Sequence, residues 1–142
     1  MKLVLLLVLI FTTLISSSEA KTTIIIRNDI SGEKIRIHCY SVHDDLGFHK
    51  LVFKQTFTFR FNRDFFQTTT FYCDFQTNHG FGNYVAYSDS IYAKCYVEDS
   101  CVWSIRVSGP CLLYYNNNLY CSPWKNSTQS LPARSFTKRV GH

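Results

Sequence analysis

The chain has 142 residues, of which 46% are hydrophobic, 16% aromatic and 18% charged, and its formal net charge is +5. This composition excludes an intrinsically disordered chain, and the length fits a single domain. The basic balance favours anionic partners such as cell-wall polymers, membrane surfaces or acidic receptors.

The first 20 residues are predicted to be a secretory signal peptide. A lysine supplies the positive charge, residues 3–15 are almost wholly apolar, and residues 18–20 have the small–x–small pattern of a cleavage site. The apolar run is too short to span a bilayer core, which takes about 20 residues. We therefore expect cleavage between Ala20 and Lys21, and a secreted, extracellular mature protein.

Short strands separated by turns are expected throughout residues 21–124, which we predict to be one domain. In chain order, the expected strands are 22–27, 34–40, 48–54, 57–61, 70–76, 81–87, 91–97, 101–107 and 111–115. Loops or turns are expected at 43–47, 78–80 and 109–110, where Asp, Asn, Gly and Pro gather. No segment after the signal peptide has a helical period.

Apolar and polar residues alternate in several of these strands, so one face of each is expected to be buried. The predicted buried sets are Ile35, Ile37 and Cys39; Phe57, Phe59 and Phe61; Phe71, Cys73 and Phe75; and Cys101, Trp103, Ile105 and Val107. This pattern predicts an all-β fold: a small antiparallel β-sandwich of about 7–9 strands, stapled by disulfides.

The six cysteines all lie after the predicted signal peptide, at positions 39, 73, 95, 101, 111 and 121. An even number in an exported chain predicts disulfides, and the absence of a Cys-x2-Cys pair argues against zinc. Because Cys39, Cys73 and Cys101 fall on apolar faces, we expect them to bridge strands inside the core. The strand pattern leaves the choice among the pairings open.

Histidines are the candidate catalytic residues. His38 lies on the polar face of its predicted strand, and His43 and His49 flank the acidic loop. Two such residues can serve as the general acid and base of a nuclease, but the spacing does not require them to converge. The chain also lacks the motifs of serine hydrolases, phosphate-binding loops and zinc proteases. We predict no catalytic residue, no cofactor and no enzymatic activity, with a hydrolase based on His38 as the alternative.

The residues suggest two further binding functions, a metal site and a nucleic acid site. The acidic loop at 43–45 offers two adjacent carboxylates, whereas calcium takes about six or more oxygen ligands, so no metal site is predicted. Tyrosines on polar faces can stack nucleic acid bases, namely Tyr40, Tyr72, Tyr87 and Tyr92. Secretion argues against that use, so we expect cross-strand aromatic pairs instead and no nucleic acid partner.

The basic charge is concentrated at the C-terminus. Residues 21–124 carry ten Lys or Arg and nine Asp or Glu, whereas residues 125–142 carry four basic residues and no acidic one. We expect this Ser/Thr-rich segment to be a flexible tail that holds the protein near an anionic cell-wall or membrane surface. The sequon Asn126-Ser127-Thr128 predicts N-glycosylation of Asn126.

Several short motifs follow one another along the chain. They are His38-Cys39-Tyr40-Ser41, Asp44-Asp45-Leu46-Gly47, Phe57-x-Phe59-x-Phe61, Thr70-Phe71-Tyr72-Cys73, Cys101-Val102-Trp103-Ser104-Ile105 and Gly109-Pro110-Cys111. Behind a signal peptide, this order resembles the plant self-incompatibility protein family, also called the S-protein homologues. The resemblance implies a small secreted β-sandwich that acts as a non-enzymatic signalling ligand for a cell-surface receptor. The alternative is a secreted defence, wall-binding or membrane-binding protein without a dedicated receptor.

The resemblance also implies a cysteine framework. Four cysteines are similar to those that the family shares, at positions 39, 73, 101 and 111, and those at 95 and 121 resemble a further pair found in part of it. The pairing expected on this basis is Cys39–Cys111, Cys73–Cys101 and Cys95–Cys121.

A ligand on a stiff scaffold presents its contact residues on loops. The segment 42–48 belongs to the resemblance motif and is expected to be structural, whereas 77–81 and 88–99 are polar segments between apolar strands. The residues that we expect to contact a partner are Thr77, Asn78, His79, Ser88, Asp89, Glu98 and Asp99.

Overall fold

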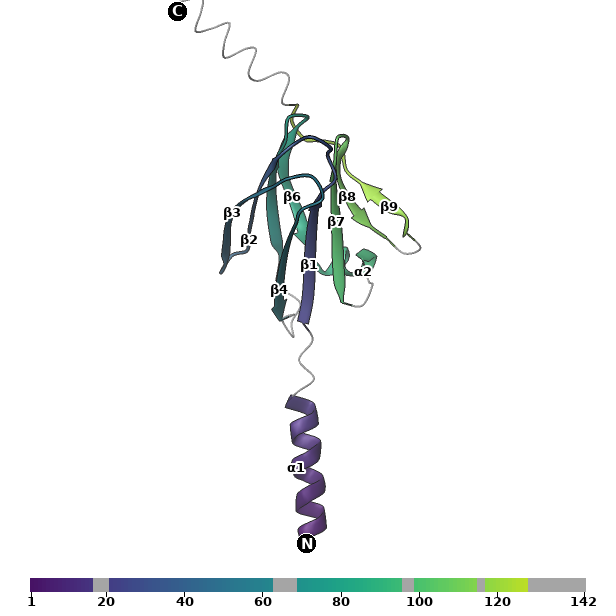
Figure 1. Cartoon of the computed structure of the whole chain (residues 1–142). Helices are drawn as coiled ribbons and strands as arrows, with labels where there is room; N and C mark the ends of the chain where they lie inside the picture. The colour runs from purple at the N-terminus through teal and green to yellow at the C-terminus, as the bar shows by residue number, and fades with distance from the viewer. Residues whose placement is uncertain (17–20, 63–68, 96–98, 115–116, 128–142) are drawn as a thin grey trace, which may run out of the picture.

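The computed structural model describes residues 1–16, 21–62, 69–95, 99–114 and 117–127. Within these ranges the chain forms two helices and nine strands (Figure 1). In chain order they are α1 (Lys2–Ser16), β1 (Lys21–Asn28), β2 (Ile35–Tyr40), β3 (Asp45–Leu51), β4 (Thr56–Asn62), β5 (Phe71–Gln76), β6 (Phe81–Tyr87), α2 (Asp89–Cys95), β7 (Ser100–Arg106), β8 (Gly109–Leu113) and β9 (Leu119–Cys121).

Helix α1 coincides with the apolar part of the predicted signal peptide. It spans 15 residues and lies apart from the strands in Figure 1. No helix among the described residues is long and apolar enough to cross a membrane. The signal peptide and its cleavage site stay predictions, because residues 17–20 lie outside the described ranges; β1 begins at Lys21.

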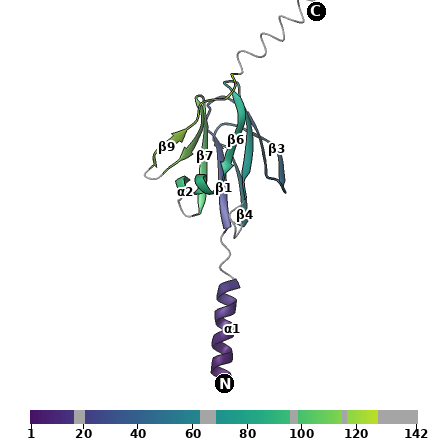
Figure 2. The same ribbon diagram turned by 180° about the vertical axis from the view of Figure 1, so that it is seen from behind.

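The strands form two sheets that pack face to face (Figures 1 and 2). One sheet has the order β4-β1-β7-β8-β9 and the other the order β3-β2-β5-β6. Neighbouring strands are antiparallel except β1 and β7, which are parallel. Parallel neighbours need a long crossover connection, and the chain between β1 and β7 supplies one because it includes all four strands of the second sheet. The predicted all-β sandwich is thereby confirmed, with one parallel contact added to it.

The core lies between the two sheets, where the alternating apolar residues meet. Ile24 and Ile26 of β1 have no exposed surface, and neither has Ile35 of β2 in the facing sheet. Trp103 Nε1 donates a hydrogen bond to the carbonyl of Ala86 at 3.0 Å, which ties β7 to β6 across the core. The predicted buried faces of β2 and β5 are confirmed, and that of β7 is confirmed at Cys101, Trp103 and Ile105.

Strand boundaries differ from the predictions at several turns. Val107 is 54% exposed because β7 ends one residue before it, and the turn falls at 107–108 rather than at 109–110. The predicted 43–47 loop is partly strand, since β3 already begins at Asp45 and ends at Leu51 rather than at residue 54. The three-residue strand β9 was not predicted.

The segment expected as a strand at 91–97 is largely the helix α2, so the prediction of no helix after the signal peptide was wrong. Ser88 caps this helix, because its Oγ accepts a hydrogen bond from the backbone N–H of Ile91 at 3.3 Å. Tyr92 OH donates to Asp99 Oδ1 at 2.7 Å. The apolar residues of α2 cover a single turn, which is too short to show a helical period in the sequence. The capping residues Ser88-Asp89 were a signal from which the start of the helix could have been predicted.

The disulfides join Cys39 to Cys73, Cys95 to Cys101, and Cys111 to Cys121, so the expected pairing was wrong at every bond. Strand register explains the first and third bonds, since Cys73 lies directly opposite Cys39 and Cys121 directly opposite Cys111. Their Cα atoms are 4.1 and 4.0 Å apart. The second bond holds the end of α2, an element that the sequence analysis did not expect, against β7. Cys39 and Cys111 cannot meet, because Cys111 pairs with Ser104 on the face of its sheet that points away from the core.

The segment after β9 crosses one end of the sandwich and pairs with the edge of β6. Asn126 forms an antiparallel bridge with Phe81, and Trp124 Nε1 donates to the carbonyl of Val107 at 2.8 Å. Glycine is required at position 80, where a Cβ would stand 2.3 Å from Trp124 Cγ. Residues 125–127, which were predicted to start the tail, are therefore attached to the sheet at least through Asn126. The rest of the predicted tail, 128–142, lies outside the described residues.

Candidate functional site

The outward face of the sheet β3-β2-β5-β6 carries an ordered array of polar and aromatic side chains. Strand register sets them in three rows: Lys50, Arg36, Gln76 and Phe81; Phe48, His38, Asp74 and Asn83; and Asp45, Tyr40, Tyr72 and Val85. Each alternates along its strand with residues that face the core. We call this surface the outer face.

His38 lies at the centre of the outer face, between two carboxylates. Its Nε2 is 2.7 Å from Asp45 Oδ1, and its Nδ1 is 3.7 Å from Asp74 Oδ2. The imidazole also stacks on Phe48, with ring centroids 4.2 Å apart. Only 19% of the His38 side chain is exposed, so this residue fastens the β2–β3 hairpin to β5 rather than projecting into solvent.

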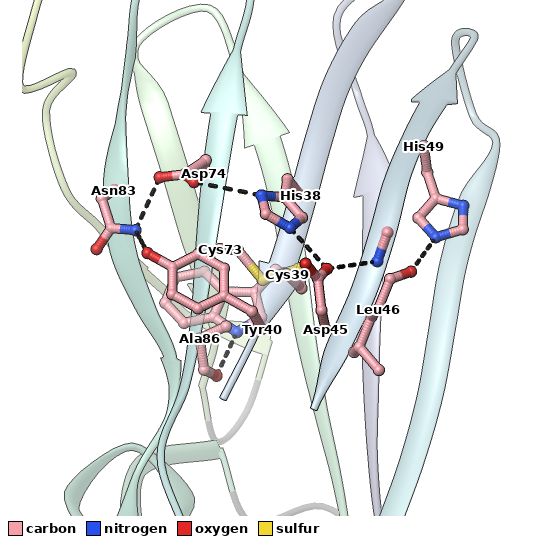
Figure 3. The surroundings of a disulfide bond; sticks show 12 residues. His38, Cys39, Tyr40, Asp45, Leu46, His49, Cys73, Asp74, Asn83 and Ala86 are labelled. Atoms are coloured by element: carbon pink, nitrogen blue, oxygen red, sulfur yellow. Dashed lines mark hydrogen bonds and ion pairs between the residues drawn. A yellow bond between two sulfur atoms is a disulfide. The ribbon is translucent and has the colours of Figure 1, made fainter. Parts of the chain in front are cut away.

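A second set of hydrogen bonds extends from Asp74. Asn83 Nδ2 donates to Asp74 Oδ1 at 2.8 Å and to Tyr40 OH at 2.9 Å. Figure 3 shows the resulting chain of contacts from Asp45 through His38, Asp74 and Asn83 to Tyr40, beside the Cys39–Cys73 disulfide. The polar groups of the outer face are thus held by one another across all four strands, and the two central strands are covalently joined.

Asp45 holds the β2–β3 turn in place. Its Oδ1 accepts the backbone N–H of Gly47 at 2.9 Å as well as the contact from His38. These two interactions, the Gly47 hydrogen bond first, lower the pKa of Asp45 below its usual value of 3.8. The carboxylate therefore stays ionised down to moderately acidic pH.

An open cleft of about 690 Å³ lies over the first two rows of the outer face. The side chains that rim it include Phe48 on one edge strand and Phe81 and Asn83 on the other, with Arg36, His38 and Gln76 on the two strands between them. Phe48 is 82% exposed, although it is a large apolar residue. A conspicuously exposed ring beside hydrogen-bonding groups in a concave surface is typical of a binding site.

The histidines that the sequence analysis singled out do not converge. His49 lies on the other face of β3, where its ring stacks on Phe57 at 4.0 Å and its Nε2 contacts the carbonyl of Leu46 at 2.8 Å. His43 is exposed in the β2–β3 turn. In the described part of the chain, no group of three or more His, Cys, Asp or Glu side chains is arranged to hold a metal ion.

The predicted partner-contact residues that the structure describes lie at opposite ends of the sandwich. At one end, Asn78 and His79 are exposed in the β5–β6 turn, beside Glu33; the His79 Nε2 to Glu33 Oε2 distance is 3.5 Å. At the other end, Asp99 contacts Tyr92 and its carbonyl accepts the N–H of Thr23, near the start of β1.

Two of the predicted contact residues, Thr77 and Ser88, have structural roles. Thr77 is buried, and its Oγ1 accepts the N–H groups of His79 and Gly80, each at 3.0 Å. Ser88 caps α2, and Asp89, which is exposed, lies in the first turn of that helix. Glu98 lies outside the described residues. The six described residues therefore do not form one surface, and the prediction that the seven contact a partner stays untested.

A separate charged cluster surrounds Asp29, whose side chain is only 9% exposed. Its carboxylate accepts two hydrogen bonds from Arg27, at 2.8 and 3.0 Å, and one from the Ser104 hydroxyl. Lys54 Nζ lies 3.4 Å away. Burial raises the pKa of Asp29, but the hydrogen bonds from Arg27 and Ser104 outweigh it, so the pKa lies below its usual value of 3.8.

This shift predicts how stability depends on pH. Because the folded-state pKa of Asp29 is lowered, the cluster stabilises the fold above about pH 4, and that contribution is lost as pH falls through the folded-state pKa. The variant Asp29→Asn is expected to be less stable than the parent protein at pH 7 and to differ from it much less at pH 2. Thermal unfolding at both pH values measures this. An equal loss of stability at the two pH values would contradict a role for the ionised carboxylate.

Asn126 lies at the rim of the cleft, beside Phe81 at the free edge of β6. Its side chain is exposed, as glycosylation requires. The predicted modification of Asn126 stays a prediction, and a glycan there would stand next to the outer face.

Sequence reasoning missed much of this site. It placed His38 and Tyr40 on a polar strand face, and the cross-strand stacking of Tyr40 on Tyr72, with centroids 5.9 Å apart, matches the expected aromatic pair. It assigned no role to Asp74 or Asn83, although both occupy polar positions of predicted strands. Tyr87, by contrast, is 2% exposed and belongs to the core.

Comparisons with known proteins agree with one another. The family model described as plant self-incompatibility protein S1 matches residues 23–124. S-protein homolog 5 of Arabidopsis thaliana is 36% identical over 104 residues, which cover 73% of this chain and 78% of that protein. Self-incompatibility protein S1 of Papaver rhoeas is 37% identical over 83 residues, covering 56% of this chain and 58% of that protein.

A solved structure shares the fold. It is described as that of SPH (Self-Incompatibility Protein Homologue) proteins, a widespread family of small, highly stable, secreted proteins from plants. The match has a TM-score of 0.58 and 19% sequence identity, and it covers 78% of this chain and 99% of that one.

Proposed function

Because the chain belongs to the plant self-incompatibility protein S1 family, we propose that it is a secreted, non-enzymatic signalling ligand that binds a plant cell-surface receptor. The single observation that carries the proposal is the outer face, which is a pre-ordered surface with an exposed aromatic ring beside a cleft. A surface of this kind can bind a partner with little loss of side-chain conformational entropy.

Secretion is supported by the N-terminal sequence and by the cysteines. An apolar helix is followed by a cleavage pattern, and all six cysteines are in disulfides, which persist in an oxidising environment. The structural relative is itself described as a secreted protein.

The proposal of a non-enzymatic role rests on the contacts of His38. Each of its ring nitrogens faces a carboxylate, so neither is directed at the space that a substrate would occupy. A general base must reach the proton that it abstracts, and His49, on the other face of β3, cannot act with His38.

Direct binding to an anionic wall polymer is the second candidate. It is favoured by the four basic residues and the absence of acidic ones after position 124. Such binding is screened by salt and needs no dedicated receptor.

The test compares two exposed apolar side chains. Phe48→Ser is expected to reduce binding of the tagged, secreted protein to plant cells about tenfold or more, since a central aromatic contact is typically worth 2 kcal/mol or more. Val107→Ser is the matched control, because Val107 is also exposed but lies in the β7–β8 turn, away from the outer face. Equal binding by the two variants would contradict the assignment of the outer face, and hydrolysis of nucleic acid or glycan by the parent protein but not by His38→Ala would contradict the non-enzymatic role.

A further inference from the structure

Two basic residues stand directly opposite each other on neighbouring strands of the outer face, and Arg36 is the one of them that lines the cleft. Arg36 of β2 pairs in register with Lys50 of β3, and both side chains are exposed. Like charges at directly opposed positions of neighbouring strands destabilise a sheet. Neither residue has an acidic ion-pair partner among the residues that the structure describes. An anion placed between them would relieve the repulsion.

Aromatic and amide side chains occupy the rest of the cleft. Phe48 lies on the edge strand β3, and Phe81 and Asn83 lie on the edge strand β6. The amide of Gln76, on β5, lies between Arg36 and Phe81. From β3 to β6 the outer face crosses three strand spacings, about 14 Å. The cleft therefore presents flat apolar surfaces at its sides and neutral hydrogen-bonding groups along its floor.

The backbone of the floor is not available for binding. β2 and β5 are central strands whose N–H and C=O groups pair with their neighbours in the sheet. An extended peptide could not add to the sheet at this position and would have to be recognised through side chains alone. The occupant must instead suit a ring face, planar amides and a pair of cations.

From this combination we infer that the cleft binds an acidic saccharide. A sugar carboxylate is held by Arg36 and Lys50, with the guanidinium able to form two parallel hydrogen bonds. The apolar face of a sugar ring packs on the exposed ring of Phe48. Sugar hydroxyls exchange hydrogen bonds with Gln76, Asn83 and the carboxylate of Asp74. This inference rests on the proposed function in that it names the partner chemistry for the same face.

The two carboxylates beside His38 argue against a more highly charged occupant. Asp45 and Asp74 border the same surface and are 68% and 49% exposed in their side chains. They would repel the closely spaced phosphates of a nucleic acid, whereas they can accept hydrogen bonds from the hydroxyls of a saccharide with one carboxylate per ring. A neutral sugar would leave the Arg36–Lys50 repulsion in place.

Titration calorimetry with the secreted protein, its disulfides intact, tests the inference. The probe is a short galacturonic acid oligomer, and the reference ligand is the same oligomer with its carboxyl groups methyl-esterified. We expect the acid to bind with a Kd at least tenfold lower than that of the ester. Equal affinity for the two ligands, or no binding of the acid, would overturn the inference.

Two matched variants separate the cleft from general charge attraction. Arg36→Gln is expected to weaken binding of the acid about tenfold, as the loss of a charge-assisted pair does. Arg60→Gln removes the same charge from an exposed position of β4, in the other sheet, and is expected to leave the Kd unchanged. Equal losses in the two variants would mean non-specific attraction and would overturn the inference.

The acidic saccharide can belong to a matrix polymer or to a glycan on a receptor. Measuring binding to plant cells before and after enzymatic digestion distinguishes these two sources. Binding that is removed by a pectin-cleaving enzyme supports the polymer. Binding that survives digestion but falls with Arg36→Gln supports a receptor glycan, and binding that survives both overturns the inference.

Failure of the inference and failure of the proposed function give different results. If Phe48→Ser abolishes binding to cells while the acidic oligomer does not bind, the inference fails and the proposed function stands. If the oligomer binds with the expected preferences but Phe48→Ser leaves binding to cells unchanged, the inference stands and the proposed function fails.

Discussion

Replacing Asn28 with alanine is expected to lower the free energy of unfolding by about 3–5 kcal/mol, because the change leaves three buried polar groups unpaired. Asn28 has no exposed surface. Its Nδ2 donates to the carbonyls of Glu33 and Leu51, at 2.7 and 2.9 Å, and its Oδ1 accepts the N–H of Ile30 at 2.9 Å. The side chain thus joins the loop after β1 to the end of β3, in the opposite sheet.

Two further variants separate hydrogen bonding from side-chain volume. Asn28→Asp keeps the shape but turns a carboxylate oxygen toward two carbonyls, so we expect a loss at least as large as that of Asn28→Ala. Asn62→Ala, at an exposed position of β4, is expected to change stability by less than about 0.5 kcal/mol. Urea unfolding of the three variants measures these differences. If Asn28→Asp were as stable as the parent protein, the hydrogen bonds would not be the source of the effect.

Which residues form the core was largely predictable from the sequence. A strand that buries one face alternates with a period of two residues, and this period is visible without knowing the partner strand. Ile35, Ile37 and Phe75 are all at most 2% exposed, as predicted. The prediction of burial was wrong at Val107, because alternation along the chain does not reveal where a strand ends.

Pairing between strands was not predictable in this way. Register decides which cysteines oppose one another, and it depends on neighbours that are distant in sequence, such as Cys39 and Cys73, which are 34 residues apart. The helix α2 was not predicted for a related reason. Its seven residues are held by the Cys95–Cys101 bond and by the contact between Tyr92 and Asp99, rather than by a long periodic pattern.

In the candidate site too, the positions within each strand were predictable and the contacts between strands were not. The polar positions of His38 and Asp74 follow from alternation within each strand, but their proximity follows from the order β3-β2-β5-β6. Phe48 stood in a strand whose buried face the sequence did not reveal, so its 82% exposure was not expected. The loops chosen for partner contact are polar because they turn and cap, as Thr77 and Ser88 show.

The second large effect is expected at the Cys39–Cys73 disulfide. Replacing both cysteines with alanine should lower the free energy of unfolding by about 3–4 kcal/mol, because the bond closes a loop of 34 residues in the unfolded chain. Replacing Cys111 and Cys121 with alanine should cost about 1 kcal/mol less, since their loop spans only 10 residues. Denaturant unfolding under oxidising conditions measures both, and a larger loss for the second pair would contradict the loop-length argument.

Tryptic digestion without reduction tests the pairing itself, and the cleavage sites make the result unambiguous. Cys39 falls in the peptide 37–50 and Cys73 in the peptide 64–94, whereas Cys95 and Cys101 share one peptide, as do Cys111 and Cys121. The pairing in the structure therefore predicts one cross-linked pair of peptides and two peptides with internal disulfides. The pairing expected from the family resemblance would instead link all four peptides through bonds between them, so a Cys39 peptide joined to the Cys111 peptide would contradict the structure. Because Cys39 and Cys73 adjoin His38 and Asp74 on the same two strands, this result also decides whether the floor of the cleft is covalently fixed.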